Sequence, residues 1–102
     1  AEGAKVIADG YKQHNPYVPD GKAPFVAYFT GFFKENPDAK VRIVRSAADG
    51  DLVWLHLHST RNAQDRGRAI VDIFRVRDGQ IVEHWDAVQP VPESAANANT
   101  MF

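Results

Sequence analysis

The chain has 102 residues, of which 44% are hydrophobic and 25% are charged, and this composition is typical of one soluble globular domain spanning residues 1–102. The formal net charge of -1 gives no attraction for nucleic acid or for an anionic membrane. The absence of cysteine excludes disulfides, thiolate zinc sites and cysteine catalysis, and it suits the cytoplasm. No apolar run approaches the roughly 18 residues of a membrane span. Either the protein is cytoplasmic, as we expect, or a signal peptide was removed before residue 1.

The N-terminal part of the sequence predicts the end of a helix followed by a loop. Residues 1–9 carry Val6 and Ile7 as an apolar stripe, and we expect them to form the last turns of a helix. Residues 10–21 contain two proline turns and are expected to form a loop. The loop nevertheless carries Tyr11, His14 and Tyr17.

Residues 22–35 give the clearest helical pattern. Aromatic residues recur every three or four positions, which places them on one wide face of a helix. They are Phe25, Tyr28, Phe29, Phe32 and Phe33. Asp20 is expected to cap the start of the helix, and Asn36 before Pro37 is expected to end it. This aromatic face can belong to the core, line a pocket, or do both.

From residue 40 onward, apolar and polar residues alternate with the period of a β-strand. The predicted strands are 40–47, 51–59, 68–77 and 81–89. Asp-Gly pairs at 49–50 and 78–79 separate them, and Asp-Gly between such runs predicts a hairpin. One helix before two hairpins predicts an α+β fold with the helix against one face of an antiparallel sheet. Residues 90–102 are expected to form an extended, mostly polar tail.

The predicted strand 68–77 is apolar on both of its faces. Val71 and Ile73 lie on one face, and the other face carries Ile70, Phe74 and Val76. A sheet that is apolar on both sides needs a cover on both sides, and the helix supplies only one. We therefore expect a homodimer through the face that carries Val71, Ile73 and Trp85.

The register of the second hairpin decides which polar side chains meet. A two-residue loop would place Asp72 opposite Trp85 and on the other face from Asp86. A three-residue loop with Gly79 in the left-handed conformation would place Asp72 opposite His84. We favour the three-residue loop, because it suits the Arg-Asp-Gly sequence and gathers Asp72, His84 and Asp86 on one face.

These three residues are the candidates for catalysis. Desolvation disfavours the charged form of a carboxylate on an apolar face, whereas a neighbouring imidazole favours it. Carboxylates balanced in this way act as general acids or bases near neutral pH. The alternative is an Asp–His pair that only fastens two strands together.

A second histidine pattern, His56 and His58 on one strand face with Trp54, invites a metal hypothesis. No third ligand follows at a suitable distance, so we expect no metal and no cofactor. The two histidines either face the pocket or only form hydrogen bonds within the protein. The candidate ligand-binding residues are His14, Asn15, Tyr17, Phe25, Tyr28, Phe29, Trp54, His56, His58 and Phe74. Phosphate-binding and hydrolase motifs are absent from the sequence, which leaves acid–base chemistry without a cofactor, or binding alone.

Three stretches carry a likeness to a known family. They are Tyr-Lys-Gln-His-Asn-Pro at 11–16, Asp-Gly-Lys before the aromatic helix, and the run from Asp72 to Asp86. Together they resemble the SnoaL-like polyketide cyclases and predicted ester cyclases of the nuclear-transport-factor-2-like superfamily. The resemblance implies a cone-shaped fold, in which a curved antiparallel sheet encloses a pocket, and a dimer. Such domains begin with further helices, which we expect to be shortened here.

The resemblance also implies roles for two residues. The carboxylate that matches Asp86 is the acid or base of the cyclases, and the residue that matches Asp72 is its partner in the pocket. An acidic partner departs from what a cyclase base requires. Two hypotheses therefore stand. One is an enzyme in which Asp86 removes a proton next to a carbonyl of a small apolar molecule, while Asp72, His84 or His14 holds the oxygen. The other is a non-catalytic ligand-binding or dimerisation module.

Overall fold

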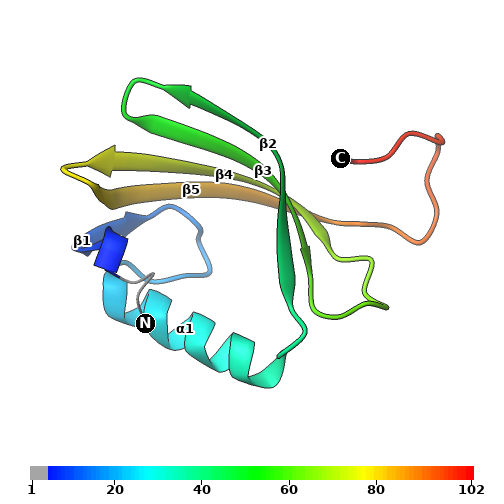
Figure 1. Ribbon diagram of the computed structural model, residues 1–102, viewed down its shortest axis with the longest axis horizontal. Coiled ribbons are helices and arrows are strands. Elements are labelled where there is room, and N and C mark those ends of the chain that lie inside the picture. Colours follow the sequence, from blue (N-terminus) through cyan, green and yellow to red (C-terminus); the bar gives the residue numbers. More distant parts are fainter. Residues whose placement is uncertain (1–4) are drawn as a thin grey trace.

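The structure is a computed structural model that describes residues 5–102, and it consists of one helix and a five-stranded sheet (Figure 1). The elements are β1 Ile7–Gln13, α1 Lys22–Glu35, β2 Lys40–Asp49, β3 Leu52–Thr60, β4 Arg68–Arg77 and β5 Gln80–Pro90. The strand order is β1-β5-β4-β3-β2, and only β1 runs parallel to its neighbour. The sheet is curved and unclosed, and α1 lies across its concave side (Figure 1). The α+β fold with a helix on a curved sheet is therefore confirmed, although the sheet is mixed. The helix of the described residues is not long and apolar enough to cross a membrane.

The prediction for the N-terminal segment was wrong. Residues 7–13 form the edge strand β1 and pair with β5, instead of ending a helix and beginning a loop. The apolar residues Ile7 and Tyr11 are four positions apart, a spacing that fits one face of a helix and one face of a strand equally well. Pairing with β5 favours the strand, because it buries both side chains. The remainder of the predicted helix, residues 1–4, lies outside the described residues.

Helix α1 has the predicted bounds but not the predicted cap. Gly21 occupies the N-cap position and provides no side-chain hydrogen bond. The Asp20 carboxylate instead accepts a hydrogen bond from the Gln13 backbone N–H at 2.8 Å, which ties the loop to the end of β1. At the other end, the Asn36 backbone N–H donates to the Phe32 carbonyl, so the helix ends before Pro37 as expected.

The β4–β5 turn also differs from the prediction. Asp78 and Gly79 both adopt left-handed backbone conformations, with φ of 51° and 75°, and Arg77 pairs with Gln80. This is a two-residue turn, and not the expected three-residue loop in which only the glycine is left-handed.

A β-bulge in β5 corrects the register that this turn would otherwise impose. Val82 has no partner on β4, because the pairing shifts by one residue on either side of it. Beyond the bulge, Asp72 faces Asp86 and Phe74 faces His84. The expected pairing of Asp72 with His84 was therefore wrong, but the extra residue returns His84 and Asp86 to the same face as Asp72.

The aromatic face of α1 is not packed against the sheet. Tyr28 is 54% exposed, Phe29 38% and Phe33 47%. Among residues 5–102, the buried apolar residues are only Ile7, Tyr11 and Leu57. The closest packing of the helix is at its start, where the rings of Tyr11 and Phe25 lie 5.8 Å apart. The remaining aromatic side chains therefore line open space between the helix and the sheet.

The C-terminal tail returns to the opposite side of the sheet (Figure 1). Residues 91–102 form no helix or strand, and the Phe102 ring stacks on His58 at 4.1 Å and on His56 at 5.8 Å. The tail thus covers part of the outer face of β3.

We expect Gly67→Ala to destabilise the fold more than Gly50→Ala does. Both glycines have a positive φ, so each alanine meets a cost of about 1–2 kcal/mol for the left-handed conformation. A Cβ at position 67 would also lie 2.1 Å from the Ser59 carbonyl oxygen, whereas nothing lies within 4 Å at position 50. This backbone clash should add about 2 kcal/mol to the loss in urea unfolding. Equal losses for the two variants would contradict the close approach of the β3–β4 loop to β3.

Candidate functional site

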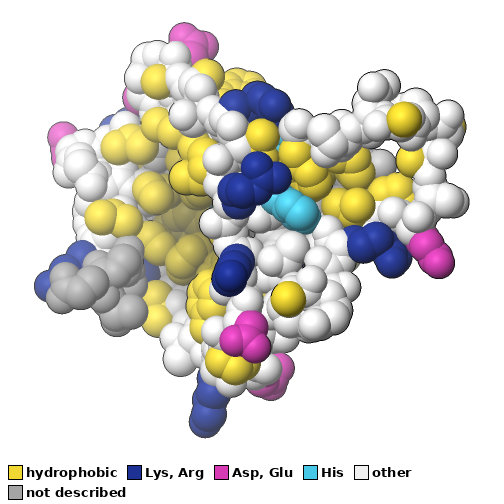
Figure 2. All heavy atoms as spheres, turned by 45° about the vertical axis from the view of Figure 1, so that its right-hand side comes forward, with side chains coloured by type: hydrophobic (Ala, Val, Ile, Leu, Met, Phe, Trp, Pro, Cys, Tyr) yellow, Lys and Arg dark blue, Asp and Glu magenta, His cyan; other side chains and the backbone are white. Residues whose placement is uncertain are grey.

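A cavity of about 260 Å³ lies between α1 and the concave face of the sheet. Its walls are mainly apolar and include Val18, Phe25, Phe29, Leu57, Ile70 and Val88. Figure 2 shows the molecule hollowed on one side, with apolar side chains in the depression. Polar side chains gather at the end of the cavity near β1, where Gln13, Asn15, Asp72, His84 and Asp86 line it.

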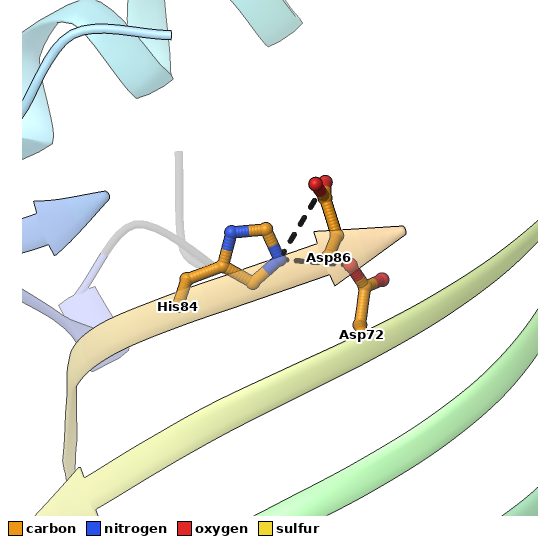
Figure 3. A group of neighbouring side chains, drawn as sticks. All are labelled: Asp72, His84 and Asp86. Carbon is orange, nitrogen blue, oxygen red and sulfur yellow. Dashed lines mark hydrogen bonds and ion pairs between the residues drawn. The ribbon is translucent and has the colours of Figure 1, made fainter. Parts of the chain in front are cut away.

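Three of these polar residues form a cluster on β4 and β5. Asp72, His84 and Asp86 point to the same side of the sheet (Figure 3). His84 Nε2 lies 2.8 Å from Asp72 Oδ1 and 3.9 Å from Asp86 Oδ2. The exposed side-chain fractions are only 9% for His84, 13% for Asp72 and 15% for Asp86. One ring nitrogen therefore lies between two carboxylates that are largely removed from solvent.

The hydrogen bonds of Gln13 determine which nitrogen of His84 carries a proton. Gln13 Oε1 accepts a bond from the Asn15 backbone N–H at 3.1 Å and lies 2.7 Å from His84 Nδ1. The Gln13 amide nitrogen donates to the Tyr11 hydroxyl oxygen at 2.9 Å. A backbone N–H can only donate, so the side-chain atom facing it must be the oxygen of Gln13. His84 Nδ1 faces the same oxygen and must therefore be protonated.

The bond between His84 Nε2 and Asp72 then requires one shared proton. With Nδ1 already protonated, an unprotonated Nε2 would direct its lone pair at an ionised carboxylate, which is repulsive. The proton is either on Nε2, beside an ionised Asp72, or on Asp72, beside a neutral imidazole. In both cases the pair holds a transferable proton at the cavity.

Asp86 is oriented through one oxygen and open at the other. Its Oδ1 accepts a hydrogen bond from the Asn15 side-chain amide at 2.8 Å. Its Oδ2 accepts no hydrogen bond from the part of the chain that the structure describes, and it lies on the side of His84 Nε2. A carboxylate held in this way can accept a proton from a ligand in the cavity.

Tyr11 supports the cluster from behind. Its side chain is 1% exposed, and burial raises the pKa of its hydroxyl well above the ordinary value. The bond from Gln13 opposes this rise in pKa, and the nearby charges of Asp72 and Asp86 add to it. The phenol therefore stays neutral and anchors Gln13.

The residues of the cluster are of the types that hold a divalent cation. The ligand atoms of Asp72, His84 and Asp86 lie within 4.8 Å of one another, and a histidine that binds a metal usually donates its other N–H to an oxygen, as His84 does. The cation would have to replace the proton between Nε2 and Asp72.

Half of the expected ligand-binding residues line the cavity, and half do not. Those that line it are Asn15, Phe25, Tyr28, Phe29 and Phe74. Tyr17 does not contribute, because it is 92% exposed. Trp54, His56 and His58 point to the outer face of the sheet, because Leu57 and Ser59 occupy the cavity side of β3. The two histidines of this outer face already have hydrogen-bond partners: His56 contacts Arg45, and His58 Nε2 donates to the Arg66 carbonyl at 2.8 Å.

His14 also lies away from the cavity. Its ring stacks on Trp85 at 4.7 Å, and its Nε2 lies 2.6 Å from a Glu83 carboxylate oxygen. The hydrogen bond from His14, followed by that from Arg75, holds the pKa of Glu83 below its usual value. His14, which was expected to contact a ligand, therefore does not line this cavity; it fastens the loop to the outer face of β5.

Gln13 and Tyr11 were missed as functional residues. The segment was read as a loop, in which side-chain directions follow no rule. In a strand, Tyr11, Gln13 and Asn15 fall at alternate positions and share one side. That spacing in the sequence was the signal that could have identified them.

Comparisons with known proteins agree with this fold. The family model of the SnoaL-like domain matches residues 1–84, so the match ends two residues before Asp86. No curated protein matches the chain. Among solved structures, the chain is similar to a candidate ketosteroid isomerase from Kribbella flavida, with a TM-score of 0.72 and 20% identity over 94% of this chain and 70% of that one. It is also similar to a SnoaL-like protein of unknown function from Burkholderia thailandensis, with a TM-score of 0.70 and 20% identity over 83% and 76% of the two chains.

A third solved structure is a candidate polyketide cyclase from Bacillus cereus. Its TM-score is 0.69, with 24% identity over 82% of this chain. The present chain spans only 59% of that protein. At these identities, the three likenesses show a common fold and leave the activity to be argued from the site.

Proposed function

The chain belongs to the SnoaL-like domain family, and from this membership and the geometry of its cavity we propose that it binds a small, largely apolar molecule and transfers a proton next to a carbonyl group of that molecule. The reaction class is isomerisation or ring closure without a cofactor. The observation that carries the proposal is the Asp86 carboxylate, which lines the cavity and which Asn15 orients through one oxygen, while the other oxygen lies 3.9 Å from His84 Nε2.

The half-exposed aromatic face of α1 supports an apolar ligand. Large contiguous apolar surfaces are uncommon on soluble proteins unless something binds them. Tyr28, Phe29 and Phe33 together present such a surface to the cavity. A flat ring system inserted between these side chains and the sheet would remove them from water, and it would place its polar group near the Asp72–His84–Asp86 cluster.

The proposed steps use two groups with opposite tasks. Asp86 Oδ2 takes a proton from the carbon next to the carbonyl, and the electron pair moves to the carbonyl oxygen. The proton held between Asp72 and His84 hydrogen-bonds to this oxygen as it gains charge. The enolate carbon then attacks a second carbonyl of the same molecule, or a proton returns to a different carbon. In ring closure Asp86 gives its proton to the new alkoxide oxygen, and in isomerisation it gives the proton to that different carbon, so the step is redox-neutral and Asp86 is ionised again at its end.

A proton-exchange experiment tests this assignment. In deuterium oxide, the protein should accelerate exchange of the protons next to the carbonyl of β-tetralone, an apolar ketone, and the exchange should persist in EDTA. Asp86→Asn should reduce the acceleration by at least about 100-fold, because general-base catalysis contributes roughly 10²–10⁴-fold. The fold should survive, since the asparagine oxygen can still accept the bond from Asn15.

The control variant is Asp38→Asn, which changes an exposed carboxylate in the turn between α1 and β2. It should exchange like the wild type. Exchange in Asp86→Asn as fast as in this control would contradict the role of Asp86, and the cavity would then be a binding site only.

We also propose a homodimer through the outer face of the sheet. Trp54 and Val71 are 39% and 40% exposed there and flank Ile73. Trp85 contributes less than the sequence suggested, because His14 and Arg75 cover its ring.

Sedimentation tests this interface. The wild type should be a dimer at micromolar concentration, and Val71→Asp should dissociate the dimer, because it places a charge in the interface. The control Thr30→Asp, at an exposed position of α1, should leave the dimer intact. A monomeric wild type would contradict the interface.

A further inference from the structure

We propose that the ligand carries an anionic group, of which a carboxylate is the simplest, at the end away from the acidic cluster, and that Arg68 recognises it. This inference rests on the proposed function, because it names the substrate class for the same cavity. The molecule would be amphiphilic: a flat apolar body with a carbonyl at one end and a negative charge at the other.

The register of the sheet separates the two ends of the cavity. Arg68, Ile70 and Asp72 are alternate residues of β4 and all line the cavity. Four residues of strand put the Cα atoms of Arg68 and Asp72 about 13 Å apart. Between them lies an apolar row, in which Ile70 pairs with Leu57 on β3 and with Val88 on β5. The floor therefore runs from the carboxylates, across an apolar strip, to a guanidinium.

The polar residues beyond this strip favour an anion. Ser59 pairs with Arg68 across the sheet, and both line the cavity together with Lys40. Arg68 also borders the adjoining hollow that Arg61 and Arg66 line. The two cations that line this end of the cavity, Lys40 and Arg68, give it a positive local potential.

The side chain of Arg68 differs from that of Arg75 in its hydrogen bonds within the part of the chain that the structure describes. Among residues 5–102, no hydrogen bond or ion pair engages its guanidinium, in contrast to Arg75, which binds Asp51 and Glu83. Asp65 lies close enough to interact with Arg68 electrostatically. Its two oxygens, however, accept the backbone N–H groups of Arg61 at 2.8 Å and Gly67 at 2.9 Å. Those bonds shape the loop, and the guanidinium N–H groups of Arg68 can therefore donate to a planar anion.

The opposite signs of the two ends would also fix the direction of the ligand. A carboxylate placed beside Asp72 and Asp86 meets like charges with little solvent to screen them, which is unfavourable. The same carboxylate beside Arg68 is attracted. The carbonyl end is thereby directed toward Asp86, where the proposed proton transfer takes place.

The test uses two fluorescent probes that differ only in charge. Each is a naphthalene with a hydroxyl at one end; the other end carries a carboxylate in the first probe and a carboxamide in the second. The wild type should bind the carboxylate about tenfold more tightly, as expected for hydrogen bonds to a charged group. The preference should shrink as salt is added. Arg68→Gln should abolish it while carboxamide binding stays the same, and Arg68→Lys should retain part of it.

Arg77→Gln is the matched control, because it removes an exposed arginine at the far end of the same strand. Equal affinities of the wild type for the two probes would overturn the inference without any variant, as would a preference that survives Arg68→Gln. Either result would leave the Asp86 exchange experiment unaffected. Failure of both probes to bind would instead contradict the assignment of the cavity as a ligand-binding site, and with it the proposed function.

Discussion

The hydrogen bond between the side-chain oxygen of Gln13 and Nδ1 of His84 fixes the chemistry of the cavity. Because the oxygen can only accept, the proton of this bond is on Nδ1, the ring nitrogen that faces away from the carboxylates, and the other nitrogen must share a proton with Asp72. Gln13 can act in this way only because β1 adds to the edge of β5 and the Asn15 backbone holds its amide in one orientation. The parallel edge strand is thus part of the site as well as part of the sheet.

The second constraint is the distance between α1 and the sheet. The helix is held at its start by the contact of Phe25 with Tyr11 and by the tie from Asp20 to β1. Its later aromatic residues face open space instead of side chains from the sheet. A cavity therefore occupies the space where helix and sheet side chains would otherwise form a hydrophobic core. A bound apolar ligand would supply the apolar contacts that these side chains lack.

The sequence predicted the elements with strong periodicity and missed those defined by pairing. The helix at 22–35 and the four strands after it were predicted because aromatic spacing and Asp-Gly turns are local signals. Strand β1 was missed because its identity depends on β5, which lies about 70 residues away in sequence. The shared face of Asp72, His84 and Asp86 was anticipated through a wrong turn type, since a bulge at Val82 leaves no clear local signal. His56 and His58 were assigned to the cavity because strand alternation groups residues on a face without telling which face is inside.

The most direct test of this account is nitrogen NMR of His84 in the unliganded protein near neutral pH, with Gln13→Leu as the comparison. The account predicts that Nδ1 is protonated and coupled to its proton in the wild type, and that this signal changes when the Gln13 oxygen is removed. An unprotonated Nδ1 in the wild type would contradict it, because the shared proton with Asp72 and the direction of the proposed proton transfer both depend on that assignment.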